Sequence, residues 1–276
     1  CKTVEMMKKD SSKKMHDFFN LYLEKNDFYL IKKELKNKLL MPKISYEDVY
    51  DLKCVQNKKL VLNILDSEVS EIPDILVKYG FSKKIKEEIS KDEIDFLKID
   101  MIIDRYYINK LKNVKVPYKC KSGKDKFVNI FIDINNLKNI LRAKEMGYKL
   151  EEIQNLFLGQ GQEIAKWKFD EIADSDSVSQ ALNSIEGTSY YNVLKDHIEI
   201  YNKDKSVQVF ENALDKNFLK QVKEISQKNY STIGPSIRFL ISKEFEIRNL
   251  KVVLKGVSEN LDPNLIKELI ITEASN

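Results

Sequence analysis

Apolar residues recur at steps of three and four along most of the chain, which is the periodicity of amphipathic helices. The clearest stretch begins at Gly234-Pro235, where proline suits the first turn of a helix. Gly256 marks its expected end or comes one residue before it. Its apolar residues share one helical face. They are Ile237, Leu240, Ile241, Ile247, Leu250, Leu254 and Val257. We therefore expect one long amphipathic helix over 234–255.

The same periodicity predicts further helices, separated by glycine, proline and polar breaks. Ser45 and Asp262 are typical N-cap residues, and Pro263 suits a first helical position. The polar stretch from Val116 to Asp125 is expected to be a surface loop. The other expected helices span 15–40, 45–65, 74–79, 81–89, 91–111, 127–143, a segment starting at 150, 165–173, 178–185, 190–201 and 207–222. The pattern predicts an all-α fold.

Three ten-residue segments share one pattern, which indicates an internal repeat. They are 27–36, 133–142 and 246–255, and each has an acid first, apolar residues second, fifth and ninth, lysine sixth and a base tenth. A second marker agrees, because Asp104 and Asp215 both follow an apolar residue and precede aromatic ones. The alternative to a repeat is chance similarity, because any two amphipathic helices can be aligned this well. This alternative is strongest for the first segment.

The repeat divides the chain into three expected domains. They cover 1–66 as a partial first repeat, 67–173 as the second and 174–276 as the third. Few residues precede the first segment, so we expect residue 1 to lie inside the first copy. The polar stretch 174–179 is expected to be a domain joint or a helix cap.

Composition narrows the class of protein. The 276 residues are 33% charged, with 47 basic and 43 acidic side chains and a net charge of +4. This mixed-sign surface lacks the clustered basic excess of a nucleic-acid binder. The sequence has no run of eighteen apolar residues, so it predicts no transmembrane helix. The three scattered cysteines indicate neither disulfides nor a zinc site and favour a reduced, cytoplasmic setting.

Candidate chemistry is sparse, so we expect no catalysis, cofactor or metal. The two histidines, His16 and His197, lie far apart, and Gly159-Gln-Gly161 lacks the third glycine of a dinucleotide loop. Trp167 is expected to be a core or interface anchor. Glu244 lies on the apolar stripe with Arg248 one turn later. This pair is either a surface ion pair at the stripe's edge or a charge facing a neighbouring helix or subunit.

Several stretches resemble one known family. They are Gly234-Pro235, 243–251, 262–269, 133–144, 187–190 and 211–215. Together they are similar to the C subunit of archaeal A-type and bacterial V-type ATPases (ATP synthases), the counterpart of the eukaryotic vacuolar ATPase d subunit. The resemblance runs from about residue 90 to the end and is weaker before it. The family's N-terminal portion is expected to be missing.

The resemblance implies three pseudo-symmetric helical domains arranged as a funnel, with the first incomplete here. It implies a non-catalytic central-stalk rotor subunit that joins the central shaft to the membrane proteolipid ring and transmits torque. It also implies a cytoplasmic, peripheral position at the inner face of the membrane. The choice of proton or sodium, and of ATP synthesis or hydrolysis, is not set by these residues.

The resemblance provides no catalytic residues, so the candidates are residues that contact other subunits. They are Arg142, Lys144, Arg238, Glu244, Glu246, Arg248 and Asn249. The alternative is that most of them tie helices together within the chain. Two other functions stay open, a generic helical-repeat scaffold for another protein and an enzyme with a site assembled from distant residues.

Overall fold

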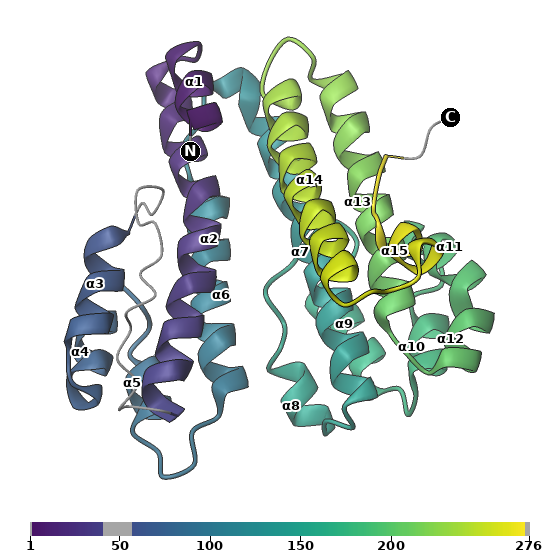
Figure 1. Cartoon of the computed structure of the whole chain (residues 1–276), viewed down its shortest axis with the longest axis horizontal. Coiled ribbons are helices and arrows are strands. Elements are labelled where there is room, and N and C mark those ends of the chain that lie inside the picture. Colours follow the sequence, from purple (N-terminus) through teal and green to yellow (C-terminus); the bar gives the residue numbers. More distant parts are fainter. Residues whose placement is uncertain (1, 41–56, 274–276) are drawn as a thin grey trace. The chain divides into compact units, whose positions relative to one another are not determined.

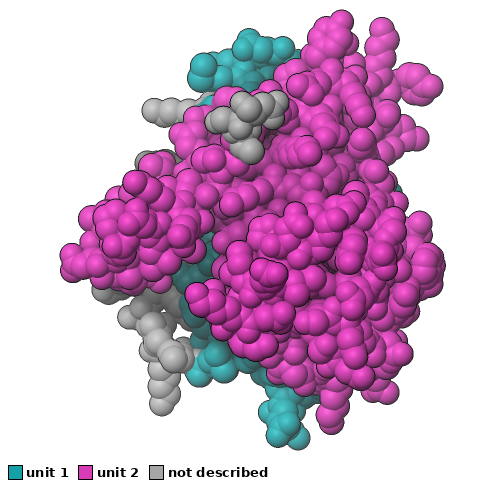
Figure 2. Space-filling model, turned by 90° about the vertical axis from the view of Figure 1, so that its right-hand side faces the viewer, with its two compact units in different colours: residues 1–117 teal, residues 118–276 magenta. Residues whose placement is uncertain are grey.

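The computed structural model describes residues 2–40 and 57–273, and these residues form helices and their connections without a strand (Figure 1). The all-α prediction is confirmed. The chain divides into two compact units, residues 1–117 and 118–276, coloured separately in Figure 2. The predicted division into 1–66, 67–173 and 174–276 places its boundaries elsewhere and stays a prediction.

The first unit is built on one long helix, α2 (Lys13–Leu40), which contacts α3 and α6. Its apolar stripe buries Phe18, Phe19 and Ile31 almost completely, so several helices share one core. The other helices are α1 (Lys2–Lys9), α3 (Lys58–Asp66), a 3-10 turn η2 (Val69–Glu71), α4 (Ile72–Lys78), α5 (Lys84–Ile89) and α6 (Phe96–Asn113). The N-terminal part of the helix predicted over 45–65 lies outside the described residues.

The second unit contains three long helices that lie side by side in Figure 1, with α13 in contact with both α7 and α14. They are α7 (Lys121–Glu145), α13 (Gln208–Lys228) and α14 (Gly234–Ser258). The shorter helices are η3 (Tyr118–Cys120), α8 (Leu150–Gln154), α9 (Lys166–Asp174), α10 (Val178–Ser184), α11 (Ser189–Leu194), η4 (Lys195–His197), α12 (Ile198–Asp204) and α15 (Pro263–Leu269).

Capping signals behave as the sequence predicts. Asp262 accepts a hydrogen bond from the Asn264 amide at 2.7 Å and starts α15. Ser177 accepts one from the Gln180 amide at 3.2 Å and starts α10, which confirms the cap alternative for the polar stretch 174–179. Gly147 adopts a φ of 72°, a conformation that glycine favours after a helix end.

The predicted loop over Lys121–Asp125 is wrong, because these residues form the first turns of α7. Packing explains the difference. Gly123 is buried so closely that a β-carbon there would lie 2.9 Å from Ile233 and 3.1 Å from Asn229. Lys124 is also buried and pairs with Asp125 at 2.9 Å. Tertiary contacts thus make a polar, glycine-containing stretch helical.

The long C-terminal helix also departs from its prediction. It continues through Gly256 to Ser258, and Gly256 is buried where α15 packs against it. Its apolar stripe is not one buried face. Ile237, Leu240 and Ile241 are buried, whereas the later part of the stripe is exposed. The two halves of α14 therefore have different surroundings.

Candidate functional site

Ion pairs join neighbouring long helices at matching repeat positions. On α2, Lys32 and Lys36 pair with Asp104 and Asp100 of α6 at 2.7 and 2.6 Å. These lysines hold the sixth and tenth places of the first repeat segment, and the two aspartates lie one helical turn apart. A pair of bases on one helix therefore meets a pair of acids on the next.

The second repeat segment makes the same arrangement between α7 and α13. Lys138 pairs with Asp215, and Arg142 forms a two-pronged ion pair with Glu211. Asp104 and Asp215 are the two residues that the sequence pattern matched as a second marker. We call each set of two ion pairs a seam. The seams support the register of the first two repeat segments.

The carboxylates of the second seam are more buried than those of the first. The side chain of Asp215 is 7% exposed, compared with 36% for Asp104. Burial lowers the pKa of Lys138, while Asp215 partly offsets this effect. Hydrogen bonding to Glu211 raises the pKa of Arg142. Asp215 also pairs with Arg248 of α14, so one carboxylate links three helices.

Two asparagines, which we call the asparagine clamps, hold the irregular segments that follow α8 and α15. The side chain of Asn136 donates to the carbonyl of Gly159 and accepts from the amide of Leu158, both at 2.9 Å. Asn249 donates to the carbonyl of Ile271 at 2.7 Å and accepts from the amide of the same residue at 3.0 Å. Both occupy the fourth repeat position. The second and third repeats thus share a local construction, which supports their alignment.

The first acid of the repeat is a buried anchor in two copies. Asp27 accepts hydrogen bonds from the backbone and side-chain nitrogens of Asn57 at 2.8 and 3.1 Å. Asp133 is fully buried and accepts from three consecutive backbone amides at 2.8–3.0 Å and from the hydroxyl of Tyr190 at 3.2 Å. Burial raises the pKa of Asp133, and these hydrogen bonds oppose it. Glu246, the third copy, is exposed and pairs with Lys243 at 2.6 Å.

Gly161 explains how the chain approaches Asp133 so closely. A β-carbon at Gly161 would lie 1.9 Å from a carboxylate oxygen of Asp133. Only glycine fits there. The Gly159-Gln-Gly161 turn therefore belongs to the backbone cradle of a buried carboxylate.

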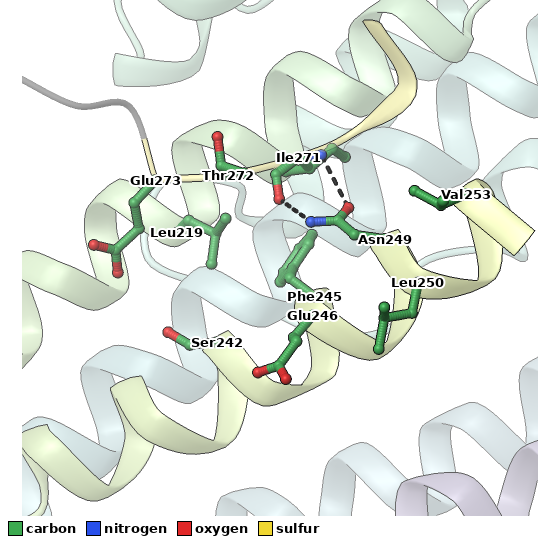
Figure 3. Close-up of a pocket in the computed structure, with 10 residues that line it drawn as sticks. All are labelled: Leu219, Ser242, Phe245, Glu246, Asn249, Leu250, Val253, Ile271, Thr272 and Glu273. Atoms are coloured by element: carbon green, nitrogen blue, oxygen red, sulfur yellow. Dashed lines mark hydrogen bonds between the residues drawn. The ribbon is translucent and has the colours of Figure 1, made fainter. Parts of the chain in front are cut away.

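A surface hollow of about 360 Å³ lies beside α14 (Figure 3). In Figure 3 the amide of Asn249 is bonded to Ile271, and Phe245 lies beneath it. Glu273, also on the rim, is held by Arg238 at 2.6 Å. Asn249 and Glu273 of this hollow thus join α14 to the C-terminal segment. The hollow is an apolar depression and carries no catalytic arrangement of the kind that reaction chemistry needs.

Most of the seven predicted contact residues have partners inside the chain. Arg142 and Arg248 belong to the seam region, Arg238 binds Glu273, and Asn249 holds Ile271. The ammonium of Lys144 donates to the carbonyls of Ala173, at 2.8 Å, and Ser175. Glu244 is half-buried. These bonds favour the alternative that the residues tie helices together, and any contact with other subunits stays a prediction.

Sequence reasoning missed the roles of Asp133 and Asp215. It used Asp133 only as the first acid of a repeat and Asp215 only as a marker. A carboxylate among apolar helix positions was the available signal, because a buried charge requires partners. Trp167 is 68% exposed, so it is not a core anchor, and the interface alternative remains.

The described segments offer little other chemistry. Over residues 2–40 and 57–273, no three His, Cys, Asp or Glu side chains gather closely enough to hold a metal ion. Across the same ranges, no helix has the length and apolar character needed to cross a membrane. Cys120 is a buried free thiol whose pKa is raised by burial.

Comparison with known proteins identifies relatives of this chain. Residues 1–269 match the model of a family described as ATP synthase (C/AC39) subunit. The match includes the first ninety residues, where the resemblance was weaker. The A-type ATP synthase C subunit of Methanocaldococcus jannaschii is 35% identical over 70% of the chain and 49% of its own length. The C subunits of Methanobrevibacter smithii and Pyrococcus horikoshii are 30% and 29% identical, over 98% and 97% of the chain.

These alignments leave part of each relative uncovered. The chain spans about half of the length of the Methanocaldococcus protein and 72% and 71% of the other two. The family match nevertheless covers nearly every residue that carries the seams, the asparagine clamps and the buried carboxylates. The chain belongs to the ATP synthase (C/AC39) subunit family.

Proposed function

We propose that the chain is a non-catalytic central-stalk subunit of a rotary A/V-type ATPase. It connects the central shaft to the membrane proteolipid ring and transmits torque between them. The observation that carries this proposal is the family match over residues 1–269. The three predicted repeat domains, arranged as a funnel, are part of the same proposal.

The internal construction suits a part that bears mechanical load. Torque transmission requires helices that do not slide past one another when force is applied at one end. The seams fix α2 to α6 and α7 to α13 at paired positions, and Asp215 adds α14 to the second seam. Buried, hydrogen-bonded charges specify one register because a shifted register leaves them unpaired.

Residues that contact another subunit must be exposed on the surface of this chain. Of the seven predicted residues, Glu246 and Arg142 are exposed. We place Glu246 at a polar joint with another subunit, where charges set orientation and association rate more than affinity. The position in the cell follows from the proposed partners and is the cytoplasmic face of the membrane.

Binding to purified shaft subunits and to the detergent-solubilised proteolipid ring tests the proposal. The intact, full-length protein is mixed with each partner separately and then with both, and complexes are measured by size exclusion with light scattering. We expect a complex with each partner and a ternary complex with both. Binding to neither partner would overturn the rotor function and leave the generic helical scaffold.

Charge reversal at the joint gives a sharper test. Glu246→Arg should weaken one of the two complexes about tenfold and flatten its salt dependence, because an attractive charge contact is lost and the new repulsion is screened by salt. Glu259→Arg, an exposed change at the end of the same helix, is the matched control. Equal effects of the two variants would remove Glu246 from the proposed joint.

A further inference from the structure

The second half of α14 presents an apolar stripe to the surface. Ile247 and Leu250 are each 55% exposed, and Leu254 is 70% exposed. Val257 extends the stripe by one turn at 65%. Scattered apolar side chains on a surface are ordinary, but a contiguous stripe marks an interaction site.

The other two repeat segments show the equivalent stripe in a buried state. The same three repeat positions, the second, fifth and ninth, are buried in the other two copies. On α2 they are Phe28, Ile31 and Leu35, at 3%, 0% and 1% exposure. On α7 they are Ile134, Leu137 and Leu141, at 3%, 2% and 2%. The third copy is the exception among three equivalent helix faces.

A helix of one kind packs against the long helix in both buried copies. α6 packs on α2, and α13 packs on α7. Each covering helix carries two carboxylates four residues apart, Asp100 with Asp104 and Glu211 with Asp215. In each case these acids pair with the bases at the sixth and tenth repeat positions.

α14 retains the complementary bases. Lys251 and Lys255 hold the sixth and tenth positions, and both are exposed. Lys255 lies 3.8 Å from Glu259, which follows the end of its own helix. The face thus has the apolar stripe and the two lysines of a seam, without a covering helix of the α6 or α13 kind among the described residues.

We propose that the face of α14 formed by Ile247, Leu250, Lys251, Leu254 and Lys255 docks an amphipathic helix of a partner protein. That helix carries two carboxylates four residues apart beside an apolar stripe. Charge complementarity with the two existing seams carries this assignment. A second copy of the chain fits less well, because the acid pairs of α6 and α13 are already bonded within their own seams. The proposal rests on the internal repeat and goes beyond the rotor function.

A helical peptide with the sequence of residues 95–113 is the probe. It copies α6 with its cap and contains Asp100 and Asp104. A hydrocarbon staple on the face opposite the acids keeps it helical, and a fluorophore reports binding to the full chain by anisotropy. We expect saturable binding that weakens as the salt concentration rises, since the seam is electrostatic.

Charge reversal identifies the face. The double variant Lys251→Glu/Lys255→Glu should weaken probe binding at least about tenfold. A probe with Asp100→Lys and Asp104→Lys should bind that variant and not the unchanged protein. Lys216→Glu/Lys220→Glu is the matched control, because these two lysines are also exposed and four residues apart, on α13. The control should bind the original probe normally.

Three outcomes overturn the proposal. The probe shows no saturable binding, or Lys251→Glu/Lys255→Glu binds it as well as the control does, or the chain forms a dimer that Leu254→Asp dissociates. The last result would show that a second copy covers the stripe. Leu254→Asp replaces an exposed side chain, so circular dichroism should show an unchanged fold and the binding result stays interpretable.

Discussion

Single buried carboxylates have structural roles that their neighbours in sequence do not reveal. Asp215 pairs with Lys138 of α7 and Arg248 of α14, and only 7% of its side chain is exposed. Removing one member of a buried group leaves the others charged and without compensation. The ion pair of Asp104 is more exposed to solvent, so removing the Asp104 carboxylate lowers the free energy of unfolding less.

Asp215→Asn should lower the free energy of unfolding by about 3 kcal/mol, because two cations lose their shared carboxylate. Asp104→Asn, its counterpart in the first seam, should cost about 1 kcal/mol or less. Urea unfolding followed by circular dichroism measures both. Equal losses would show that burial does not distinguish the two seams.

Asp133 allows a test of whether burial or hydrogen bonding dominates a carboxyl pKa. Burial raises the pKa of Asp133 above its ordinary value of 3.8. A raised folded pKa stabilises the fold fully below the unfolded pKa, and this contribution is lost as pH rises through the folded pKa. The stability of the unchanged protein relative to Asp133→Asn should therefore fall as the pH rises above the ordinary carboxyl pKa of 3.8. A relative stability that grows with pH in urea titrations would show that the four hydrogen-bond donors dominate.

At the scale of elements, α14 combines two environments in one continuous helix. The apolar stripe of its first half is buried, whereas its second half carries the exposed stripe and contacts α15 through Gly256. Gly256 was expected to end the helix, but it permits close approach instead. A β-carbon there would lie 2.6 Å from Cγ1 of Ile266, a buried side chain of α15.

Gly256→Ala sets two effects against each other. Alanine favours a helix over glycine by about 1 kcal/mol, whereas overpacking costs about 1–3 kcal/mol. We expect a net loss of about 1 kcal/mol in unfolding free energy, with faster hydrogen exchange in α15 and unchanged exchange in α14. In the double variant Gly256→Ala/Ile266→Ala the two changes should compensate in part. Strictly additive losses would argue against the contact.

At the scale of the molecule, the chain contains two compact units with separate cores. The unit 118–276 includes the buried seam of α7 and α13, the cradle of Asp133 and both asparagine clamps. Its polar anchors find their partners inside the unit. Such a unit meets the conditions for independent folding.

A fragment covering residues 118–276 should therefore fold alone. We expect a helical circular dichroism spectrum and one cooperative urea transition, as in other single domains of similar size. Asp215→Asn within the fragment should shift its midpoint to lower urea, as in the full chain. A broad transition without a midpoint would show that the unit depends on residues 1–117.

Much of the secondary structure could be read from the sequence. The apolar period located most helices, and Asp262 and the polar stretch 174–179 marked helix starts correctly. The misses at Lys121–Asp125 and Gly256 share a cause. At both places a glycine allows close packing of another part of the chain, the segment around Ile233 at Gly123 and the helix α15 at Gly256. Such contacts cannot be read from the local sequence.

The sequence by itself determined the all-α class, the repeat segments and the family, because helical period, caps and motif residues are local properties of the chain. Only the tertiary structure decided which charges are anchors and which are surface. Arg142 pairs with Glu211 and Asn249 with Ile271, although both were candidates for contacts with other subunits. It also showed that one apolar pattern is buried on α2 and α7 and exposed on α14. The physical reason is that periodicity defines a face, while burial depends on whether another helix covers it.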